Sequence, residues 1–244
     1  LHDVGKSSSE EIEKAVASAK AALPTWKSTP VVERAKVMRR IHSLFLDRAE
    51  PIAQMITAEI AKTITDSREE VFEYSAPSWG KAAEEILRHR GLSFPSTQEQ
   101  TNNKRLVMSY RPVGVVAAVT PYNFPTDISS IALAHIAAAG NTVIWKPSEY
   151  AAVSCAMLAD LFTEAGLPKG VINVCQGDGS VGDTLISHTD VNGIFFTGST
   201  TTGRKIAAKA ALRPHLLELG GDGPFIILAD ADIDAAVEGA MNGC

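Results

Sequence analysis

Polar side chains that could act together on a substrate stand directly after short apolar runs of the sequence. In the loop Thr120-Pro121-Tyr122-Asn123-Phe124-Pro125, two prolines flank an asparagine. Because proline restricts the backbone, the Asn123 amide can be held in one direction, as a donor to a developing oxyanion must be. The competing interpretation is a rigid turn whose asparagine caps the next helix.

The next apolar run ends in Lys146-Pro147-Ser148-Glu149. An ammonium can donate to the hydroxyls of a diol such as a ribose, and a carboxylate can accept from them. Glu149 would tolerate a free 2′-hydroxyl and repel a 2′-phosphate. The alternative is an ordinary acid at a helix N-terminus with an exposed lysine.

A third polar group lies in Glu218-Leu219-Gly220-Gly221, again at the end of an apolar run. If the Glu218 carboxylate faced an apolar cleft, its pKa would rise and it would suit general base catalysis. The alternative is an acid in a surface loop.

Two glycine-containing loops could hold a phosphate. The segment Gly198-Ser199-Thr200-Thr201-Thr202-Gly203 opens a helix, so its backbone amides and the Ser199 hydroxyl favour an anion site. An ordinary N-cap would explain Ser199 or Thr200 but not the flanking glycines, Gly198 and Gly203. The segment 177–182 matches the GxGxxG pattern, but the acid expected about 20 residues later is missing. We therefore interpret it as a helix-entry loop and not as a pyrophosphate cradle.

These loops need a scaffold that brings the ends of several strands together. From Val113 onward, β-branched runs alternate with Ala-rich helical stretches, which predicts a Rossmann-like α/β fold with a parallel sheet flanked by helices. Ligands of such sheets bind at the carboxyl ends of the strands. Strands are predicted at 113–119, 142–145, 171–174, 193–196, 216–217 and 225–228, and helices at 128–139, 151–165, 182–187, 202–211 and 232–242.

The first part of the chain has a different pattern. Apolar residues recur at helical spacing from residue 9 to about residue 90, which predicts four or five helices. One of the three serines at 7–9 should cap the first helix. The polar segment 94–111 reads as an excursion that ends in a strand. Helix breaks are expected near Pro24, Pro30, Pro51 and Pro77.

Composition narrows the classes of function. The 244 residues have a formal charge of −5, and residues 106–244 carry 7 basic and 13 acidic side chains, so a basic surface for nucleic acid is not expected. No stretch predicts a membrane span or a secretory signal, and we expect a cytoplasmic protein. The cysteines are three and the six histidines are scattered, which argues against disulfides and a structural metal.

Taken in order along the chain, the motifs 121–125, 146–149, 196–200 and 218–221 resemble those of the aldehyde dehydrogenase superfamily. The resemblance extends from Ser9 to the end. It implies NAD(P)-dependent oxidation of a small-molecule aldehyde to a carboxylic acid through a thiohemiacetal and a thioester on a cysteine. Asn123 would then be the oxyanion donor and Glu218 the base for the deacylating water.

The resemblance also implies the cofactor site. Lys146 and Glu149 would hold the adenosine ribose, Ser199 the pyrophosphate, and Gly179 would lie near the adenine. Glu149 favours NAD, with NADP as the alternative. The other expected cofactor-binding residues are Thr120, Pro121, Tyr122, Gly198, Gly203 and Leu219.

The sequence departs from the family pattern in three places. The family's nucleophile follows Gly-Gln-x, so we expect it beyond residue 244; Cys244 comes too early, and Cys155 and Cys175 read as core residues. Ala132 stands where many members have a lysine and His135 where a proline is usual. Ala61 replaces a common glycine.

The expected organisation has four parts. Residues 1–93 would be the helical part of the cofactor domain, 94–112 an oligomerisation strand of a homodimer or homotetramer, 113–221 the NAD(P)-binding core, and 222–244 the start of a catalytic domain. Two other functions stay open: a coenzyme A-acylating aldehyde dehydrogenase, and a non-catalytic dinucleotide-binding or interaction module.

Overall fold

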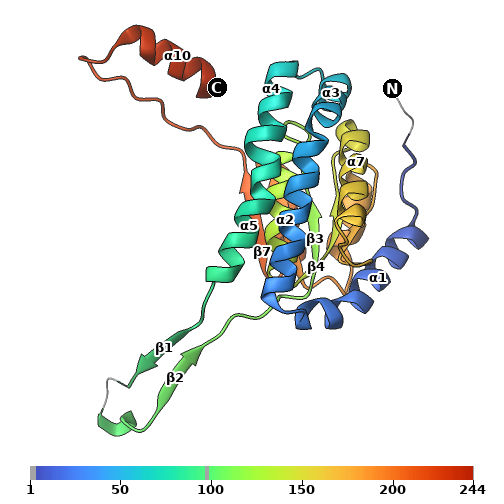
Figure 1. Cartoon of the computed structure of the whole chain (residues 1–244), viewed down its shortest axis with the longest axis vertical. Helices are drawn as coiled ribbons and strands as arrows, with labels where there is room; N and C mark the ends of the chain where they lie inside the picture. Colours follow the sequence, from blue (N-terminus) through green and yellow to red (C-terminus); the bar gives the residue numbers. More distant parts are fainter. Residues whose placement is uncertain (1–3, 97–98, 244) are drawn as a thin grey trace.

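The computed structural model describes residues 4–96 and 99–243. Its centre is a parallel five-stranded sheet with the order β5-β4-β3-β6-β7, and helices cover both faces (Figure 1). This architecture confirms the predicted α/β fold. The strands are β3 (Val115–Val119), β4 (Thr142–Lys146), β5 (Ile172–Val174), β6 (Gly193–Gly198) and β7 (His215–Leu219).

The two faces of the sheet bury different helices. Alternate residues of a strand point to opposite faces: Val116 and Ala118 of β3 join a core with the helices of residues 31–88, whereas Val115 and Ala117 join a core with the first helix and with residues 181–210. The strands are therefore buried on both sides, as their near-continuous apolar runs predict.

Helices dominate the first part of the chain: α1 (Ser9–Ser28), α2 (Val31–Asp47), α3 (Ala49–Ile60), α4 (Ile64–Glu69), the π-helix η1 (Glu70–Ser75) and α5 (Ala76–Arg88). Of the three candidate serines, Ser8 is the N-cap of α1, and it forms a capping box with Glu11. The break expected near Pro24 is wrong, because α1 continues through it. Ala19 and Trp26, buried on either side of Pro24, hold the helix against the body of the protein.

The break expected near Pro77 is also absent. Proline has no N–H and crowds the preceding turn of a helix. Here the preceding turn is the π-helix η1, whose wider ring of hydrogen bonds lets the chain pass from α4 to α5 without interruption. The Ser75 hydroxyl also donates to the Glu70 carbonyl across this turn, at 2.9 Å.

The second part of the chain follows the predicted alternation with boundary shifts of up to three residues. Its helices are α6 (Asp127–Ala138), α7 (Ala152–Glu164), α8 (Gly179–Ser187), α9 (Thr200–Ala210) and α10 (Ile233–Gly243), and short 3-10 turns η2 (Glu99–Thr101) and η3 (Glu149–Ala151) complete the list. The strand predicted at 225–228 is wrong. These residues are exposed and have no regular secondary structure, and within the described residues no strand pairs with them.

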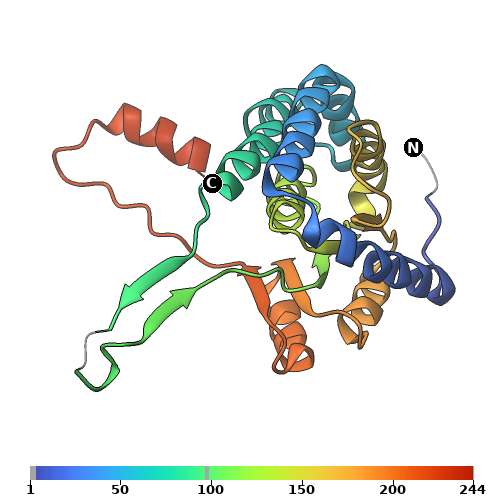
Figure 2. The same cartoon turned by 60° about the horizontal axis from the view of Figure 1, so that its bottom comes forward.

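Segment 94–111 belongs to a hairpin instead of a single strand. Strand β1 (Leu92–Pro95) pairs antiparallel with β2 (Arg105–Met108), and the hairpin projects from the body (Figures 1 and 2). In the described part of the chain, no helix has both the length and the apolar character that crossing a membrane requires.

Candidate active site

The structure brings the predicted polar loops to one edge of the sheet. The last residue of β3, Val119, lies opposite Lys146 of β4 on one side and opposite Phe196 of β6 on the other. Thr197 of β6 in turn lies opposite Glu218 of β7. Since β6 separates β3 from β7, the axes of those two strands are about 10 Å apart. The chain leaves β3 toward β4 on one side and returns on the other as β6, and ligands of α/β sheets bind at such a switch point.

Asn123 lies in the loop between β3 and α6, and its side chain is exposed. Within the described residues its amide has no hydrogen-bond partner, so it is free to donate to a ligand. The alternative in which Asn123 caps α6 is wrong, because the first amides of α6 bond elsewhere. Neighbouring Tyr122 is 53% exposed and packs edge-on against Tyr150, with ring centroids 5.7 Å apart, and Pro121 is partly buried.

Thr120 anchors the start of this loop. Its hydroxyl accepts from the Trp145 indole N–H at 2.9 Å and bonds the Ser129 hydroxyl at 2.8 Å, and the residue is only 3% exposed. The side chain therefore joins β3, β4 and α6 within the protein. A contact between this hydroxyl and a cofactor stays a prediction.

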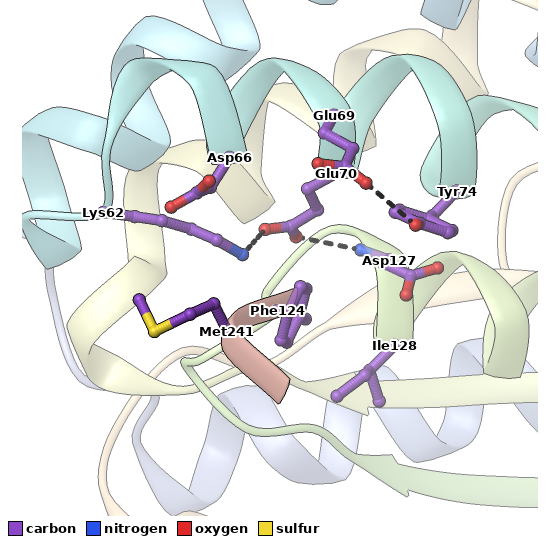
Figure 3. A pocket seen from close by; sticks show the side chains of 9 residues that line it. All are labelled: Lys62, Asp66, Glu69, Glu70, Tyr74, Phe124, Asp127, Ile128 and Met241. Atoms are coloured by element: carbon purple, nitrogen blue, oxygen red, sulfur yellow. Dashed lines mark hydrogen bonds and ion pairs between the residues drawn. The ribbon is translucent and has the colours of Figure 1, made fainter. Parts of the chain in front are cut away.

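A buried ion pair that the sequence did not reveal holds the end of the loop. The Lys62 ammonium lies 2.7 Å from Glu70 Oε2, and these side chains are 12% and 0% exposed (Figure 3). Glu70 Oε1 accepts from the backbone N–H of Thr126 at 2.8 Å and of Asp127 at 3.1 Å. Glu70 therefore caps α6 from the π-helix, 56 residues earlier in the chain.

Beside the loop lies a cavity of about 900 Å³ whose walls come from α4, η1, α6, α10 and the Asn123 loop (Figure 3). Asp127 lines it with one carboxylate oxygen buried and, among the described residues, without a partner. Burial, together with the neighbouring Glu70 carboxylate, raises the pKa of Asp127 to about 6. The lining residues are Lys62, Asp66, Glu69, Glu70, Tyr74, Phe124, Asp127, Ile128 and Met241.

Lys146 and Glu149 form the pair that the spacing suggested. The Lys146 ammonium lies 3.2 Å from Glu149 Oε2, with the lysine 4% exposed and the glutamate side chain 43% exposed. The alternative with an exposed lysine is therefore wrong. The buried ammonium orients a carboxylate that still reaches solvent, so Glu149 keeps acceptor sites for a ligand.

A groove of about 330 Å³ runs between α8 and α9 over the ends of β3, β4 and β6. Gly179 and Gly182 of α8 line it. A Cβ on Gly182 would lie 3.6 Å from the Lys146 side chain and 3.8 Å from Val119, so the glycine keeps this end of the groove open. Lys146, whose ammonium lies 3.2 Å from Glu149 Oε2, also lines this groove.

The contacts of Asp178 support the interpretation of the GxGxxG match as a helix-entry loop. Its carboxylate caps α8 by accepting from the Ser180 N–H and hydroxyl, at 2.9 and 2.6 Å. These bonds and Lys6 hold the pKa of Asp178 well below its usual range. An ionised carboxylate at this helix N-terminus would repel a pyrophosphate.

At the start of α9, Ser199 acts as an ordinary N-cap. Its hydroxyl accepts from the Thr202 N–H at 3.2 Å and donates to the Thr202 hydroxyl at 3.0 Å. Gly203 serves close packing, because a Cβ there would come within 2.4 Å of Leu219 on β7. A Cβ on Gly198 would similarly meet the Phe196 ring at 2.6 Å. Their contacts with a cofactor stay predictions.

Glu218 lies in strand β7, so it is not a loop residue. Its side chain is exposed, and the apolar cleft assumed for it is not formed by the described residues. Leu219 is 38% exposed. What the structure supports is the position of Glu218, at the same sheet edge as Asn123 and one strand beyond β6.

The two described cysteines are core residues, as the sequence predicts. Burial raises the pKa of the Cys155 thiol well above its usual value and that of Cys175 to about 11. Neither has the exposed thiolate of a nucleophile. Cys244 lies outside the described residues. Ala132 is buried in α6, and His135 bonds Glu85 of α5 at 2.9 Å, away from the Asn123 loop.

The fold and the site together define an α/β protein with a groove at the carboxyl edge of its parallel sheet. The sequence matches the model of the Aldehyde dehydrogenase family over residues 1–244, and the chain belongs to this family. No group of three or more His, Cys, Asp or Glu side chains within residues 4–96 and 99–243 is placed to hold a metal ion.

Its relatives include named enzymes. A glutarate-semialdehyde dehydrogenase of Pseudomonas aeruginosa is 38% identical over 244 residues, covering 99% of this chain and 50% of the relative. An NADP-dependent glyceraldehyde-3-phosphate dehydrogenase of Streptococcus equinus is 39% identical over 246 residues, covering 100% and 52%. The solved NADP-dependent glyceraldehyde-3-phosphate dehydrogenase of Bacillus halodurans C-125, complexed with NADP, is 34% identical with a TM-score of 0.94, covering 100% and 52%. The chain thus spans about half the length of the curated relatives it matches.

Proposed function

We propose that the protein containing this chain oxidises an aldehyde to a carboxylic acid with NAD(P). The observation that carries the proposal is the free Asn123 amide at the sheet edge that also presents the Lys146 and Glu149 pair and Glu218. These are the groups the reaction needs: an oxyanion donor, a ribose site and a base. Family membership supports the same reaction.

The residues present fit a dinucleotide. Gly182 leaves the α8 side of the groove open, and Lys146 orients Glu149 so that its second oxygen can accept from a ribose hydroxyl. When bound, the nicotinamide accepts a hydride from the substrate carbon. Because a 2′-phosphate would meet the Glu149 carboxylate, we propose NAD as the preferred cofactor, although two of the relatives are named as NADP-dependent.

The remaining steps use a cysteine thiolate and water. The thiolate adds to the aldehyde carbon, and the Asn123 amide donates to the oxygen as negative charge develops there. Loss of hydride leaves a thioester. Glu218 then takes a proton from water, which displaces the thiolate and releases the acid. The nucleophile is a cysteine other than Cys155 and Cys175, and we propose that it lies beyond residue 244.

The test is hydride transfer by the full-length protein. With a panel of aldehydes and NAD, absorbance of the reduced cofactor should rise, and Asn123→Ala should lower the rate of the first turnover by about 100-fold or more. Asn103→Ala, an exposed asparagine in the β1–β2 hairpin, is the matched control and should leave that rate unchanged. Absence of turnover with both NAD and NADP would refute the proposal.

Glu218→Gln separates the two halves of the reaction. The first hydride transfer should persist while steady-state turnover falls, because only hydrolysis of the thioester needs the base. Equal loss of both rates would contradict the assigned role. Turnover that requires added coenzyme A would instead identify the acylating version of the enzyme.

A further inference from the structure

The ion pair of Lys62 and Glu70 takes no part in the reaction proposed above, yet every described hydrogen bond that these two side chains make outside the pair goes to the loop that carries Asn123 or to the start of α6. We propose that Lys62 and Glu70 are positioning residues that hold the Asn123 amide in its donor orientation. This inference rests on the proposed function, since it presupposes that Asn123 is the oxyanion donor.

Lys62 contacts the loop on the N-terminal side of Pro125. Its ammonium donates to the Asn123 carbonyl at 3.1 Å. It also lies 3.4 Å from the centre of the Phe124 ring (Figure 3). The backbone of Asn123 is thereby tied to a cation that is itself fixed by Glu70. An ammonium over an aromatic face is attractive, and more so when it is partly removed from water.

Glu70 accepts hydrogen bonds from the chain on the C-terminal side of Pro125. Its Oε1 accepts from the Thr126 N–H and hydroxyl and from the Asp127 N–H, at 2.8, 2.9 and 3.1 Å. Its other oxygen is occupied by Lys62. The two residues therefore hold the backbone on both sides of Pro125, at Asn123 and at Thr126 and Asp127, and the loop has little freedom to swing.

The pair is poorly explained as a device for stability alone. A buried ion pair loses most of its attraction to desolvation, and a well-packed apolar pair is often as stable. Glu70 is fully buried, and its carboxylate reaches the loop from the first residue of the π-helix η1. Such a costly ion pair is beneficial if it places a catalytic donor precisely, because a displacement of about 1 Å can lower a rate by about 100-fold.

The test is a double-mutant cycle on the full-length protein, with the rate of the first hydride transfer as the readout. Lys62→Met should slow this step by about 10- to 100-fold and leave the affinity for NAD unchanged. In an Asn123→Ala background the same substitution should change the rate by less than about 2-fold, because Lys62 would act through an amide that is no longer present. A purely structural role would slow both backgrounds by the same factor.

Three companion variants make the result decisive. Lys62→Arg keeps a cation and donors and should restore most of the rate. Glu70→Gln should slow the same step as Lys62→Met does. Arg68→Met removes an ion pair with Glu50 on the neighbouring helices that does not touch the loop, and it should leave the rate unchanged.

The outcomes separate the inference from the function beneath it. If Asn123→Ala leaves the rate unchanged, the proposed function loses its oxyanion donor and the inference falls with it. If Asn123→Ala slows the step and folded Lys62→Met does not, or if the effects multiply, only the inference is overturned. Should Lys62→Met not fold, Lys62→Gln, which removes the charge and shortens the side chain by one atom, replaces it in the cycle with the same expectations.

Discussion

Ala61 has a left-handed backbone, with φ of 57°, where α3 ends and the chain turns toward Lys62. This conformation is unfavourable for a residue with a Cβ and is usual for glycine at the end of a helix. The left-handed backbone therefore gives a physical reason for the glycine that the resemblance leads us to expect in place of Ala61. The strained residue places Lys62 where it can reach both Glu70 and the Asn123 loop.

Relief of this strain should be measurable. Ala61→Gly is expected to raise the free energy of unfolding by about 0.5–1 kcal/mol, because the gain of 1–2 kcal/mol in the left-handed region is partly offset by the greater freedom of glycine in the unfolded chain. Urea titrations of the two proteins would show it. Ala132→Gly, in the middle of α6, is the control and should be destabilising; a loss of stability in Ala61→Gly would contradict the explanation.

Asp127 gives a prediction about pH. Its pKa in the folded protein, about 6, lies above the ordinary value of 3.8, so the folded state binds this proton more tightly than the unfolded state does. Ionisation of Asp127 therefore costs more free energy in the folded state than in the unfolded state. This loss of stability is absent below the unfolded pKa and complete above pH 6. Asp127→Asn should therefore raise the free energy of unfolding by about 1 kcal/mol at pH 7.5, allowing for partial exposure, and by much less at pH 4, which is close to the unfolded pKa.

Urea titrations at both pH values would test this. Asp160→Asn, an exposed carboxylate of α7, should have the same small effect at each pH. A change in stability for Asp127→Asn that is independent of pH would mean that its carboxylate is not penalised on folding.

At the scale of elements, the turn that joins β4 to η3 carries the proposed contact with the ribose of the cofactor. It holds the Lys146 and Glu149 pair and begins with a buried ammonium. Glu149→Ala should lower the affinity for NAD by about 10-fold, since a hydrogen bond from a ribose hydroxyl to a carboxylate is worth about 1.5 kcal/mol or more. The same substitution should lower the affinity for NADP by a smaller factor.

Fluorescence titrations of the full-length protein with each cofactor would measure the two affinities. Glu164→Ala, an exposed acid at the end of α7, is the matched control and should change neither. An unchanged ratio of NAD to NADP affinity in Glu149→Ala would show that the ribose contact is misassigned.

The elements themselves could largely be predicted, because a parallel sheet buried on both faces imposes apolar runs that alternate with helices. The failures have local causes. Residues 225–228 have the composition of a strand, but pairing depends on a neighbour that lies elsewhere in space. Helix α1 continues through Pro24 because tertiary packing outweighs the loss of one hydrogen bond, and η1 accommodates Pro77.

The site could be predicted only in part, for a related reason. Four residues of the site stand at the ends of predicted strands: Asn123, Lys146, Glu149 and Glu218. They could be predicted because ligands of α/β sheets bind at the carboxyl ends of the strands. Lys62 and Glu70 are ordinary charged residues of a helical segment, more than 50 residues from the loop they hold. Because buried charges are usually paired, burial of Lys62 and Glu70 would have suggested that they interact. Burial, however, is not visible in a single sequence.

At the scale of the whole molecule, the β1–β2 hairpin extends away from the two cores (Figure 2). One face of it carries the cross-strand pairs Leu92 with Met108 and Phe94 with Leu106, each side chain 39–64% exposed. Such an apolar surface is typical of an interface. It supports the proposal that this segment joins copies of the protein into a dimer or tetramer.

A charge on that face should therefore separate the copies. Leu106→Asp is expected to reduce the mass in solution to that of a monomer, as measured by size-exclusion chromatography with light scattering. Val107→Asp places the same charge on the opposite face, at a side chain that is 67% exposed, and should leave the assembly intact. Equal behaviour of the two variants would contradict an interface on the Leu106 face.

The π-helix has a consequence for how this protein tolerates changes in length. One residue more or less turns everything beyond it on a helix by about 100°. The single wide turn at 70–75 sets the phase in which Glu70 faces the loop while Trp79, one element later, faces the core. A one-residue deletion there would restore a regular helix and put those two orientations in conflict, so this segment should accept substitutions far more readily than it accepts deletions.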